Sequence, residues 1–265
     1  MSKTDGKFAK LEPEVYDRAY YFKMGKWYEE GNPHARRMID FILGYLDICE
    51  DDVVLETGCG IGEKAIEFAK YSKKVLAVDN NEVAISCARE FMAKYPDRAH
   101  RVNLIPASLQ CLPFEDKSVH KICFSEVIEH VRDENSVVAE LNRVLAPGGR
   151  MAVTTWPSLA NLSWFYRFRL RRGKDRGHPT DDNPQTPWGL RSLVSRHGFH
   201  VEGTKLQDFY LWLPGTGVTL TGKFNGNFLE RLLEKYLTRG FWGNFLASSI
   251  RVFCKKVKDS PYIKH

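Results

Sequence analysis

The sequence predicts an α/β fold in which helices cover both faces of a parallel sheet. Short apolar runs alternate with helical patterns from residue 53 to residue 155, which is typical of strands joined by helical crossovers. A glycine-rich turn at 58–62 follows the first run, and Asp79 ends the second. Because parallel strands end at the same edge of a sheet, we expect the turn and the carboxylate to form one nucleoside-binding crevice.

The individual elements follow from hydrophobic periodicity and from residues that start or stop helices. The predicted strands are 53–57, 74–79, 101–106, 119–125 and 150–155, and the predicted helices between them are 63–71, 81–94 and 134–145. Asp133 is placed to cap the last of these helices, and Pro147-Gly148-Gly149 is placed to end that unit. Residues from about Glu12 to Asp47 have helical spacing, which Gly31-Asn32-Pro33 interrupts.

The last third of the chain is less regular. Residues 156–185 form an aromatic and basic insertion, after which Thr186-Pro187 predicts the start of a short helix that reaches His197. The remaining predicted elements are a strand from Phe199 to Leu206, a second insertion at about 208–244 with a helical pattern at 229–237, and a last strand from Phe245 to Phe253.

Composition favours one elaborated domain, since 43% of the 265 residues are hydrophobic and can form a full core. Within it we expect a helical cap at 1–49, a binding core at 50–156, and lid or substrate insertions with the last strands at 157–265. No secretory signal is visible, no apolar stretch approaches the roughly 20 residues of a membrane span, and the cysteines are scattered. We therefore expect a cytoplasmic protein with reduced thiols and no metal site.

The residues around the glycine turn indicate the charge of the ligand. A dinucleotide site has the pattern Gly-x-Gly-x-x-Gly, whose third glycine allows close helix packing. Here Glu63 stands at that place, and Glu56 precedes the turn. Two carboxylates repel a pyrophosphate and suit a cation, such as a sulfonium that carries an α-amino group.

The run Leu55-Glu56-Thr57-Gly58-Cys59-Gly60-Ile61-Gly62 resembles the first motif of class I S-adenosylmethionine-dependent methyltransferases, in the ubiquinone/menaquinone methylase-like (type 11) branch. Residues 106–114 are similar to the family's adenine-side loop, 124–131 to its fourth strand end, and 141–149 to the helix and turn before its fifth strand. The resemblance covers about residues 50–156. It implies S-adenosylmethionine as cofactor and a Rossmann-like, doubly wound, seven-stranded mostly parallel sheet. It also implies an antiparallel last strand, an N-terminal helical lid and two insertions in the C-terminal half.

The resemblance and the geometry of such a crevice assign roles to single residues. The residues expected to bind the donor are Glu56, Gly58, Gly60, Gly62, Asp79, Asn80, Ser108, Leu109 and Ser125. The glycines shape the loop under the methionine part of the donor. Glu56 binds the amino end of that part, and Asp79 binds the ribose. Ser108 stands where the family usually has an aspartate, so its contact to the adenine is weaker. For Asn80 and Ser108 the alternative is an ordinary turn position.

Methyl transfer from a sulfonium is an in-line displacement, for which the enzyme mainly aligns the acceptor and excludes water. A general base is needed only where the acceptor loses a proton. His130, which follows the fourth strand with Glu126 and Glu129, is one candidate, and its alternative role is packing. His178, in the insertion that would cover the site, is the other, and its alternative is an exposed loop position.

The stretch 164–172 interleaves aromatic residues with arginines, which suits a lipid headgroup surface, an acidic substrate or nucleic acid. We expect a small-molecule acceptor, or a lipid- or glycan-linked one, and a peripheral membrane contact through this stretch. The alternative is a solvated basic face. The sequence makes no prediction of the oligomeric state.

Other functions stay open at this point. An RNA methyltransferase would suit the net charge of +6, but no Asn-Pro-Pro-Tyr-like tetrad follows the fourth strand and no RNA-binding module is appended, so a nucleic-acid partner is not favoured. A non-catalytic protein that binds S-adenosylmethionine would suit Ser108. A nicotinamide oxidoreductase conflicts with Glu63 and with the lack of a Tyr-x-x-x-Lys pair.

Overall fold

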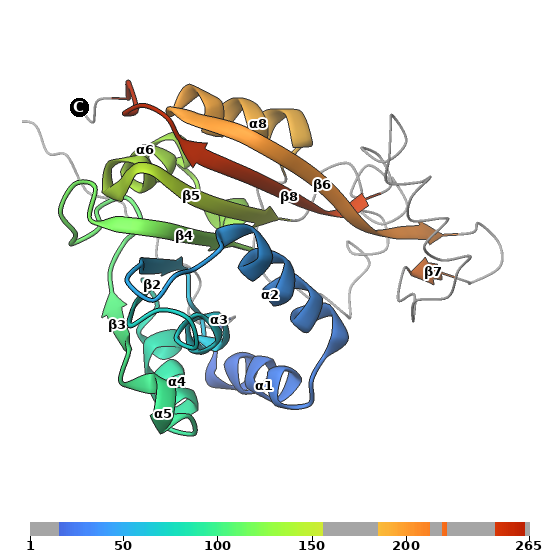
Figure 1. Ribbon diagram of the computed structural model, residues 1–265. Helices are drawn as coiled ribbons and strands as arrows, with labels where there is room; N and C mark the ends of the chain where they lie inside the picture. Colours follow the sequence, from blue (N-terminus) through green and yellow to red (C-terminus); the bar gives the residue numbers. More distant parts are fainter. Residues whose placement is uncertain (1–15, 156–184, 213–218, 222–246, 263–265) are drawn as a thin grey trace, which may run out of the picture.

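The computed structural model describes residues 16–155, 185–212, 219–221 and 247–262 (Figure 1). Their strands form one sheet in the order β3-β2-β1-β4-β5-β8-β6-β7. The strands are β1 (Val53–Thr57), β2 (Lys74–Asp79), β3 (Val102–Pro106), β4 (Val119–Ser125), β5 (Leu145–Thr155), β6 (Phe199–Trp212), β7 (Thr219–Thr221) and β8 (Ala247–Lys256).

The direction of the strands confirms the predicted mostly parallel sheet with an antiparallel last strand. β1 to β5 pair in parallel, whereas β8 runs antiparallel to both of its neighbours, β5 and β6. The sequence predicts seven strands, and the short β7, which pairs with β6 alone, is an addition to them. The strand order reverses between β1 and β4, and ligands of open parallel sheets bind at the carboxyl ends of the strands that flank such a reversal.

Helices lie on both faces of the sheet, as Figure 1 shows. The helices are α1 (Arg18–Glu29), α2 (Pro33–Leu46), α3 (Glu63–Phe68), α4 (Glu82–Met92), α5 (Pro96–Ala99), α6 (Glu134–Val144) and α8 (Pro187–Arg196), with a 3₁₀ turn, η1, at Ile128–His130. Residues of α1 to α4 share one hydrophobic cluster with one face of the sheet, and residues of α6 and α8 share a second cluster with the other face. The two clusters form the core that fixes the strand ends.

The predicted helix caps are confirmed. Asp133 accepts a hydrogen bond from the Ser136 amide at 3.0 Å, and Thr186 accepts one from the Gly189 amide at 2.9 Å, each at a helix start. Gly198 follows α8 with φ of +87°, a conformation that glycine adopts without a steric cost.

The strand boundaries differ from the prediction where pairing extends a strand past its turn residues. Pro147-Gly148-Gly149 was expected to separate the helix before it from the strand after it, but these residues lie within β5. β5 begins at Leu145 because Leu145 already pairs with Val119. β6 extends to Trp212 because its backbone continues to pair with β8 as far as Phe209 and Ala247, and then with β7. α5 is a further element that the hydrophobic pattern did not predict.

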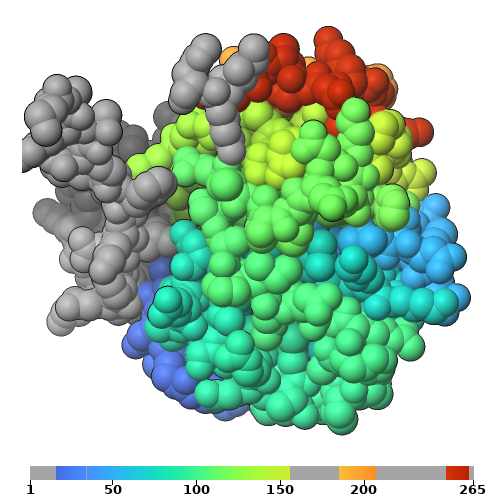
Figure 2. Space-filling model, turned by 90° about the vertical axis from the view of Figure 1, so that its left-hand side faces the viewer, coloured from blue at the N-terminus to red at the C-terminus, as the bar shows by residue number. Residues whose placement is uncertain are grey.

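Figure 2 shows the side of the molecule on which the sheet ends at β3, with α4 to α6 and their connections coloured from teal through green to yellow-green. No helix in the described part of the chain is both long and apolar enough to cross a membrane. His178, the stretch 164–172 and the helical pattern at 229–237 fall outside the described residues.

Candidate functional site

The turn between β1 and α3 is built on three glycines in the left-handed conformation. Gly58, Gly60 and Gly62 have φ values of +60°, +55° and +76°, which other residues rarely adopt. The Gly62 amide donates to the Cys59 carbonyl at 2.8 Å and closes the turn. The Cys59 amide donates to the Val78 carbonyl at 2.9 Å, so the turn is held against the end of β2.

The three glycines face different surroundings. A Cβ atom at Gly58 would lie 2.4 Å from Val127, and one at Gly62 would lie 2.1 Å from Met92, so these two positions make room for the protein's own side chains. At Gly60 the nearest atom would be on the Tyr21 ring, 3.8 Å away. Gly60 is therefore the glycine of the turn whose missing side chain leaves space for a ligand.

Asp79 joins the glycine turn to the end of β2. Its Oδ2 accepts a hydrogen bond from the Gly60 amide at 2.9 Å, and its Oδ1 accepts one from the Asn81 amide at 2.9 Å. Burial raises the pKa of Asp79, and the backbone amides of Asn81, Gly60 and Asn80 limit the rise. A carboxylate oxygen can accept more than one hydrogen bond, so Asp79 keeps capacity for hydroxyl donors.

A buried cluster of three charged residues, which sequence reasoning missed in part, lies beside the turn. The Lys64 ammonium lies 2.7 Å from Glu63 Oε1 and 3.7 Å from Glu56 Oε1. Burial raises the pKa of Glu56 to about 8; the charge of Glu63 adds to the rise and that of Lys64 opposes it. The predicted pair of carboxylates is therefore present, but a lysine offsets part of its charge.

Tyr20 and Tyr21 of α1, and Tyr16 just before it, lie together near the glycine turn. Tyr21 lies next to Gly60, and its hydroxyl accepts a hydrogen bond from Asn81 Nδ2 at 3.3 Å. The Tyr20 ring contacts the rings of Tyr16 and Tyr21 edge to face, at centroid distances of 5.1 and 5.3 Å. Burial raises the pKa of Tyr20, and the nearby carboxylate of Glu63 adds to it. The N-terminal segment therefore covers the glycine turn, in accordance with the expected helical lid.

The end of β4 is a network of polar side chains joined to β5. The hydroxyls of Ser125 and Thr154 are 2.8 Å apart, and Thr154 also donates to Glu126 Oε1 at 2.8 Å. Glu126 has φ of +56°, which costs a residue with a side chain roughly 1–2 kcal/mol. Such strain at a strand end is common at functional sites. The Ser125 hydroxyl is already used by Thr154, so a donor contact there would need its backbone or a rearranged side chain.

His130 ends the 3₁₀ turn that follows β4. Its amide donates to the Val127 carbonyl at 2.9 Å, and its half-buried ring lies edge to face with Tyr16 at 6.1 Å between centroids. The neighbouring Glu129 is buried and accepts a hydrogen bond from Thr155 at 2.9 Å. His130 thus lies at the end of β4, against Tyr16, which precedes α1.

The predicted adenine-side residues lie in two turns at the ends of β2 and β3. Asn80 is exposed and directly follows Asp79. Ser108 is exposed, and its hydroxyl accepts a hydrogen bond from the Gln110 amide at 3.3 Å, as in an ordinary turn. Leu109 is half-buried against the second hydrophobic cluster. Since the Ala107 amide donates to the Asp79 carbonyl at 3.1 Å, the two turns are adjacent.

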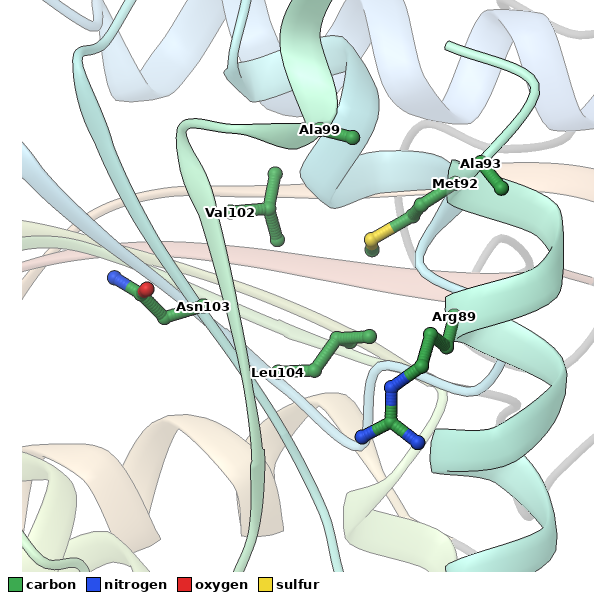
Figure 3. A pocket seen from close by; sticks show the side chains of 7 residues that line it. All are labelled: Arg89, Met92, Ala93, Ala99, Val102, Asn103 and Leu104. Atoms are coloured by element: carbon green, nitrogen blue, oxygen red, sulfur yellow. The ribbon is translucent and has the colours of Figure 1, made fainter. Parts of the chain in front are cut away.

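A separate pocket of about 400 Å³ opens between α4, α5 and β3. Val102 and Leu104 of β3 face Met92 and Arg89 of α4, and Asn103 points away on the other side of the strand (Figure 3). None of the predicted site residues lines this pocket. It touches the glycine turn only through Met92, which lies behind Gly62.

The side chains around the glycine turn fit S-adenosylmethionine. Among the residues that the structure describes, no group of three or more His, Cys, Asp or Glu side chains could hold a metal ion. The open face of Gly60, the anchored Asp79 and the buried Glu56 fit a nucleoside that carries a cationic amino acid.

The comparisons with known proteins agree with this geometry. Residues 55–153 match the family described as methyltransferase domain (type 11). The chain is 29% identical over 211 residues to a probable S-adenosylmethionine-dependent methyltransferase of Mycolicibacterium smegmatis, covering 76% of this chain and 71% of that protein. It is 38% identical over 145 residues to a probable methyltransferase of the same kind from Mycobacterium tuberculosis, covering 55% of this chain and 44% of that protein.

Two more distant relatives carry names that state an acceptor. Sterol 24-C-methyltransferase ERG6 of Saccharomyces cerevisiae is 30% identical over 106 residues, which are 40% of this chain and 27% of that protein. Geranyl diphosphate C-methyltransferase of Streptomyces coelicolor, solved with Mg²⁺, geranyl diphosphate and S-adenosylhomocysteine, superposes with a TM-score of 0.58 at 14% identity, over 84% of this chain and 79% of that chain. The similarity to geranyl diphosphate C-methyltransferase shows a shared fold only. Residues 55–153 therefore match a methyltransferase domain, and the described chain has the class I, Rossmann-like fold of S-adenosylmethionine-dependent methyltransferases, to which its relatives are assigned.

Proposed function

We propose that the chain binds S-adenosylmethionine between the glycine turn and helix α1 and methylates an apolar or lipid-like small molecule. The observation that supports the donor site is the Gly60–Asp79 hydrogen bond, which holds beside Gly60 the carboxylate that we propose binds the ribose. When bound, S-adenosylmethionine supplies an activated methyl group. The protein's own residues orient the two reactants and exclude water from them.

The predicted donor contacts are retained as part of this proposal. Asp79 would accept hydrogen bonds from the ribose hydroxyls, and Glu56 would pair with the amino end. Asn80, Ser108 and Leu109 would flank the adenine, because their turns adjoin Asp79. Ser125 would lie close to the transferred methyl group, at the end of β4.

The acceptor would enter on the side of β4 and β5. Aromatic rings of Tyr16 and Tyr20 line this side with His130, and they suit an apolar acceptor. The name of one sequence relative, a sterol 24-C-methyltransferase, supports an acceptor of this class. His130 is the proposed base where the acceptor loses a proton, and His178, outside the described residues, stays a prediction.

The domain organisation and the membrane contact are also proposals. The cap at 1–49 and the insertions after 156 would enclose the acceptor, and the stretch 164–172 would approach a lipid surface. Both depend partly on residues outside the described ranges.

The acceptor class can be tested with donor that carries a labelled methyl group. Purified protein is incubated separately with a lipid extract and with a polar extract of cells, and mass spectrometry identifies labelled products. We expect label in the lipid extract with the wild-type protein and none with Asp79→Ala. Label in polar metabolites alone would contradict the lipid-like acceptor, and label in added RNA would favour the RNA alternative.

A further inference from the structure

Lys64 is an unusual residue for its position in the fold. It lies in the first turn of α3, where the side chains that follow, Ala65, Ile66 and Phe68, are buried and apolar. The Lys64 side chain is only 10% exposed, and those of Glu56 and Glu63 are 1% and 11% exposed. Lysine is rarely buried unless it is paired, and an apolar side chain would fill the same space without the cost of desolvating a charge.

The cluster pairs its charges unevenly. Glu63 holds the Lys64 ammonium at 2.7 Å, whereas Glu56 is 3.7 Å from it, beyond hydrogen-bond distance. Neither oxygen of the buried Glu56 carboxyl makes a hydrogen bond of ordinary geometry within the described residues, although the Ala65 amide is also close to it. Buried carboxyl oxygens normally have partners, so their lack of them points to a ligand.

The chemistry of the cluster matches the amino acid end of the donor. That end carries an α-ammonium and an α-carboxylate on one carbon, and the cluster presents a carboxyl group and an ammonium side by side. With Glu56 ionised, the cluster has one net negative charge, and S-adenosylmethionine, with its sulfonium, has one net positive charge. The two sets of charges therefore compensate each other in a site from which water is excluded.

We propose that Lys64 recognises the α-carboxylate of the donor, while Glu56 takes the α-ammonium and Glu63 holds Lys64 in place. The inference rests on the proposed donor site and adds to it a residue that makes the site selective for an intact amino acid. With a ligand that lacks the carboxylate, Lys64 would pair with Glu63 alone. The charge-assisted hydrogen bond between Lys64 and the ligand would then be lost.

The competing explanation is that Lys64 only neutralises two buried glutamates. Both explanations predict that a substitution of Lys64 weakens the fold, so stability does not separate them. They differ in whether the effect of the substitution depends on the carboxylate of the ligand. A double-mutant cycle between the residue and the ligand group measures that dependence.

The experiment compares two nucleosides by isothermal titration calorimetry. They are S-adenosylhomocysteine and its decarboxylated analogue, 5′-S-(3-aminopropyl)-5′-thioadenosine, and the proteins are wild type, Lys64→Met, Lys64→Arg and Lys70→Met. Lys70 is the matched control, because it pairs with Glu67 at 2.6 Å on the same segment but outside the cluster. Thermal unfolding confirms that each variant is folded.

We expect wild type and Lys70→Met to bind S-adenosylhomocysteine about 10–100-fold more tightly than the analogue, as for one hydrogen bond between charged groups. Lys64→Met should bind the two ligands equally, and Lys64→Arg should keep part of the preference. Should Lys64→Met fail to fold, the double variant Glu56→Gln/Lys64→Met, which removes both partners of the pair, serves in its place.

The outcomes separate the inference from the proposed function. A wild type that binds both ligands equally, or a Lys64→Met protein that keeps the full preference, refutes the role of Lys64 and leaves the donor site in place. A folded wild type that binds neither nucleoside refutes the donor site and this inference with it.

Discussion

The Gly60 amide donates to Asp79 Oδ2 at 2.9 Å, and this bond joins the turn after β1 to the end of β2. Gly60 and Asp79 are 19 positions apart in the chain, and the parallel pairing of β1 with β2 brings them together. The bond places a carboxylate beside the one glycine of the turn whose absent Cβ would meet its nearest neighbour, Tyr21, at an ordinary contact distance of 3.8 Å. The donor site depends on this arrangement.

Asp79 should therefore contribute strongly to donor affinity. Asp79→Ala is expected to weaken binding of S-adenosylhomocysteine by about 1.5–3 kcal/mol, because hydrogen bonds to a charged group are lost. Isothermal titration calorimetry measures the change, with Asp97→Ala, an exposed acid in α5, as control. Unchanged affinity in a folded Asp79→Ala protein would show that the ribose is bound elsewhere.

Gly60 and Gly31 offer a matched pair of substitutions. Both have a positive φ, +55° and +69°, so valine should cost roughly 1–2 kcal/mol of stability at either position. A Cβ at Gly31 meets nothing within 4 Å, whereas one at Gly60 enters the space next to Tyr21. We expect Gly60→Val to abolish binding of S-adenosylhomocysteine and Gly31→Val to retain it. Binding by a folded Gly60→Val protein would be incompatible with the site.

Gly62 should matter for stability instead. A Cβ there would lie 2.1 Å from Met92 Cε, the end of a flexible side chain, so Gly62→Ala forces this side chain to shift in addition to the backbone strain. Chemical denaturation should show that Gly62→Ala loses more stability than Gly60→Ala. The additional change Met92→Ala removes the contact and should recover part of the stability lost in Gly62→Ala. If stability is not recovered, the steric clash does not involve Met92.

Glu56 should make stability depend on pH. Burial raises its pKa from 4.5 to about 8, so between these values the folded protein holds a proton that the unfolded chain has lost. The stability from the neutral carboxyl is fully present below about pH 4.5 and is lost as the pH rises to about 8. In thermal unfolding, the wild type should lose stability relative to Glu56→Gln over this range. Parallel pH profiles of the two proteins would contradict the raised pKa.

His130 can be separated from the donor site by kinetics. If it removes a proton from the acceptor, His130→Gln should lower kcat by about 10²–10⁴-fold without changing the affinity for S-adenosylhomocysteine. The exposed His100 at the end of α5 provides the control His100→Gln. An equal kcat for His130→Gln and wild type would leave His130 the packing role beside Tyr16.

The sheet and the glycine turn were predictable because their signals are local. The alternation of strands and helices fixes the order of β1 to β5, and the side chains of Asp133 and Thr186 cap helices where the sequence predicts them. The strand that begins at Leu145 was not predictable, because its first bridge, to Val119, depends on a neighbouring strand.

The charged cluster and the strained glutamate were harder to foresee. A lysine after a helix start is ordinarily exposed, so Lys64 gives little sign that it is buried against Glu56 and Glu63. A weak signal exists, since Lys64 precedes the apolar run Ala65-Ile66. The left-handed conformation of Glu126 has no local signature, because it follows from the bonds to Thr154 across the sheet.

The central claim is that an anionic glycine turn holds the cationic methyl donor rather than a phosphorylated coenzyme. Its most direct test is a calorimetric titration of the wild-type protein with S-adenosylmethionine and, separately, with NADH. The account predicts saturable binding of S-adenosylmethionine, weakened roughly 10- to 150-fold in Asp79→Ala, and no binding of NADH. Binding of NADH, or of neither nucleotide by the folded protein, would contradict it.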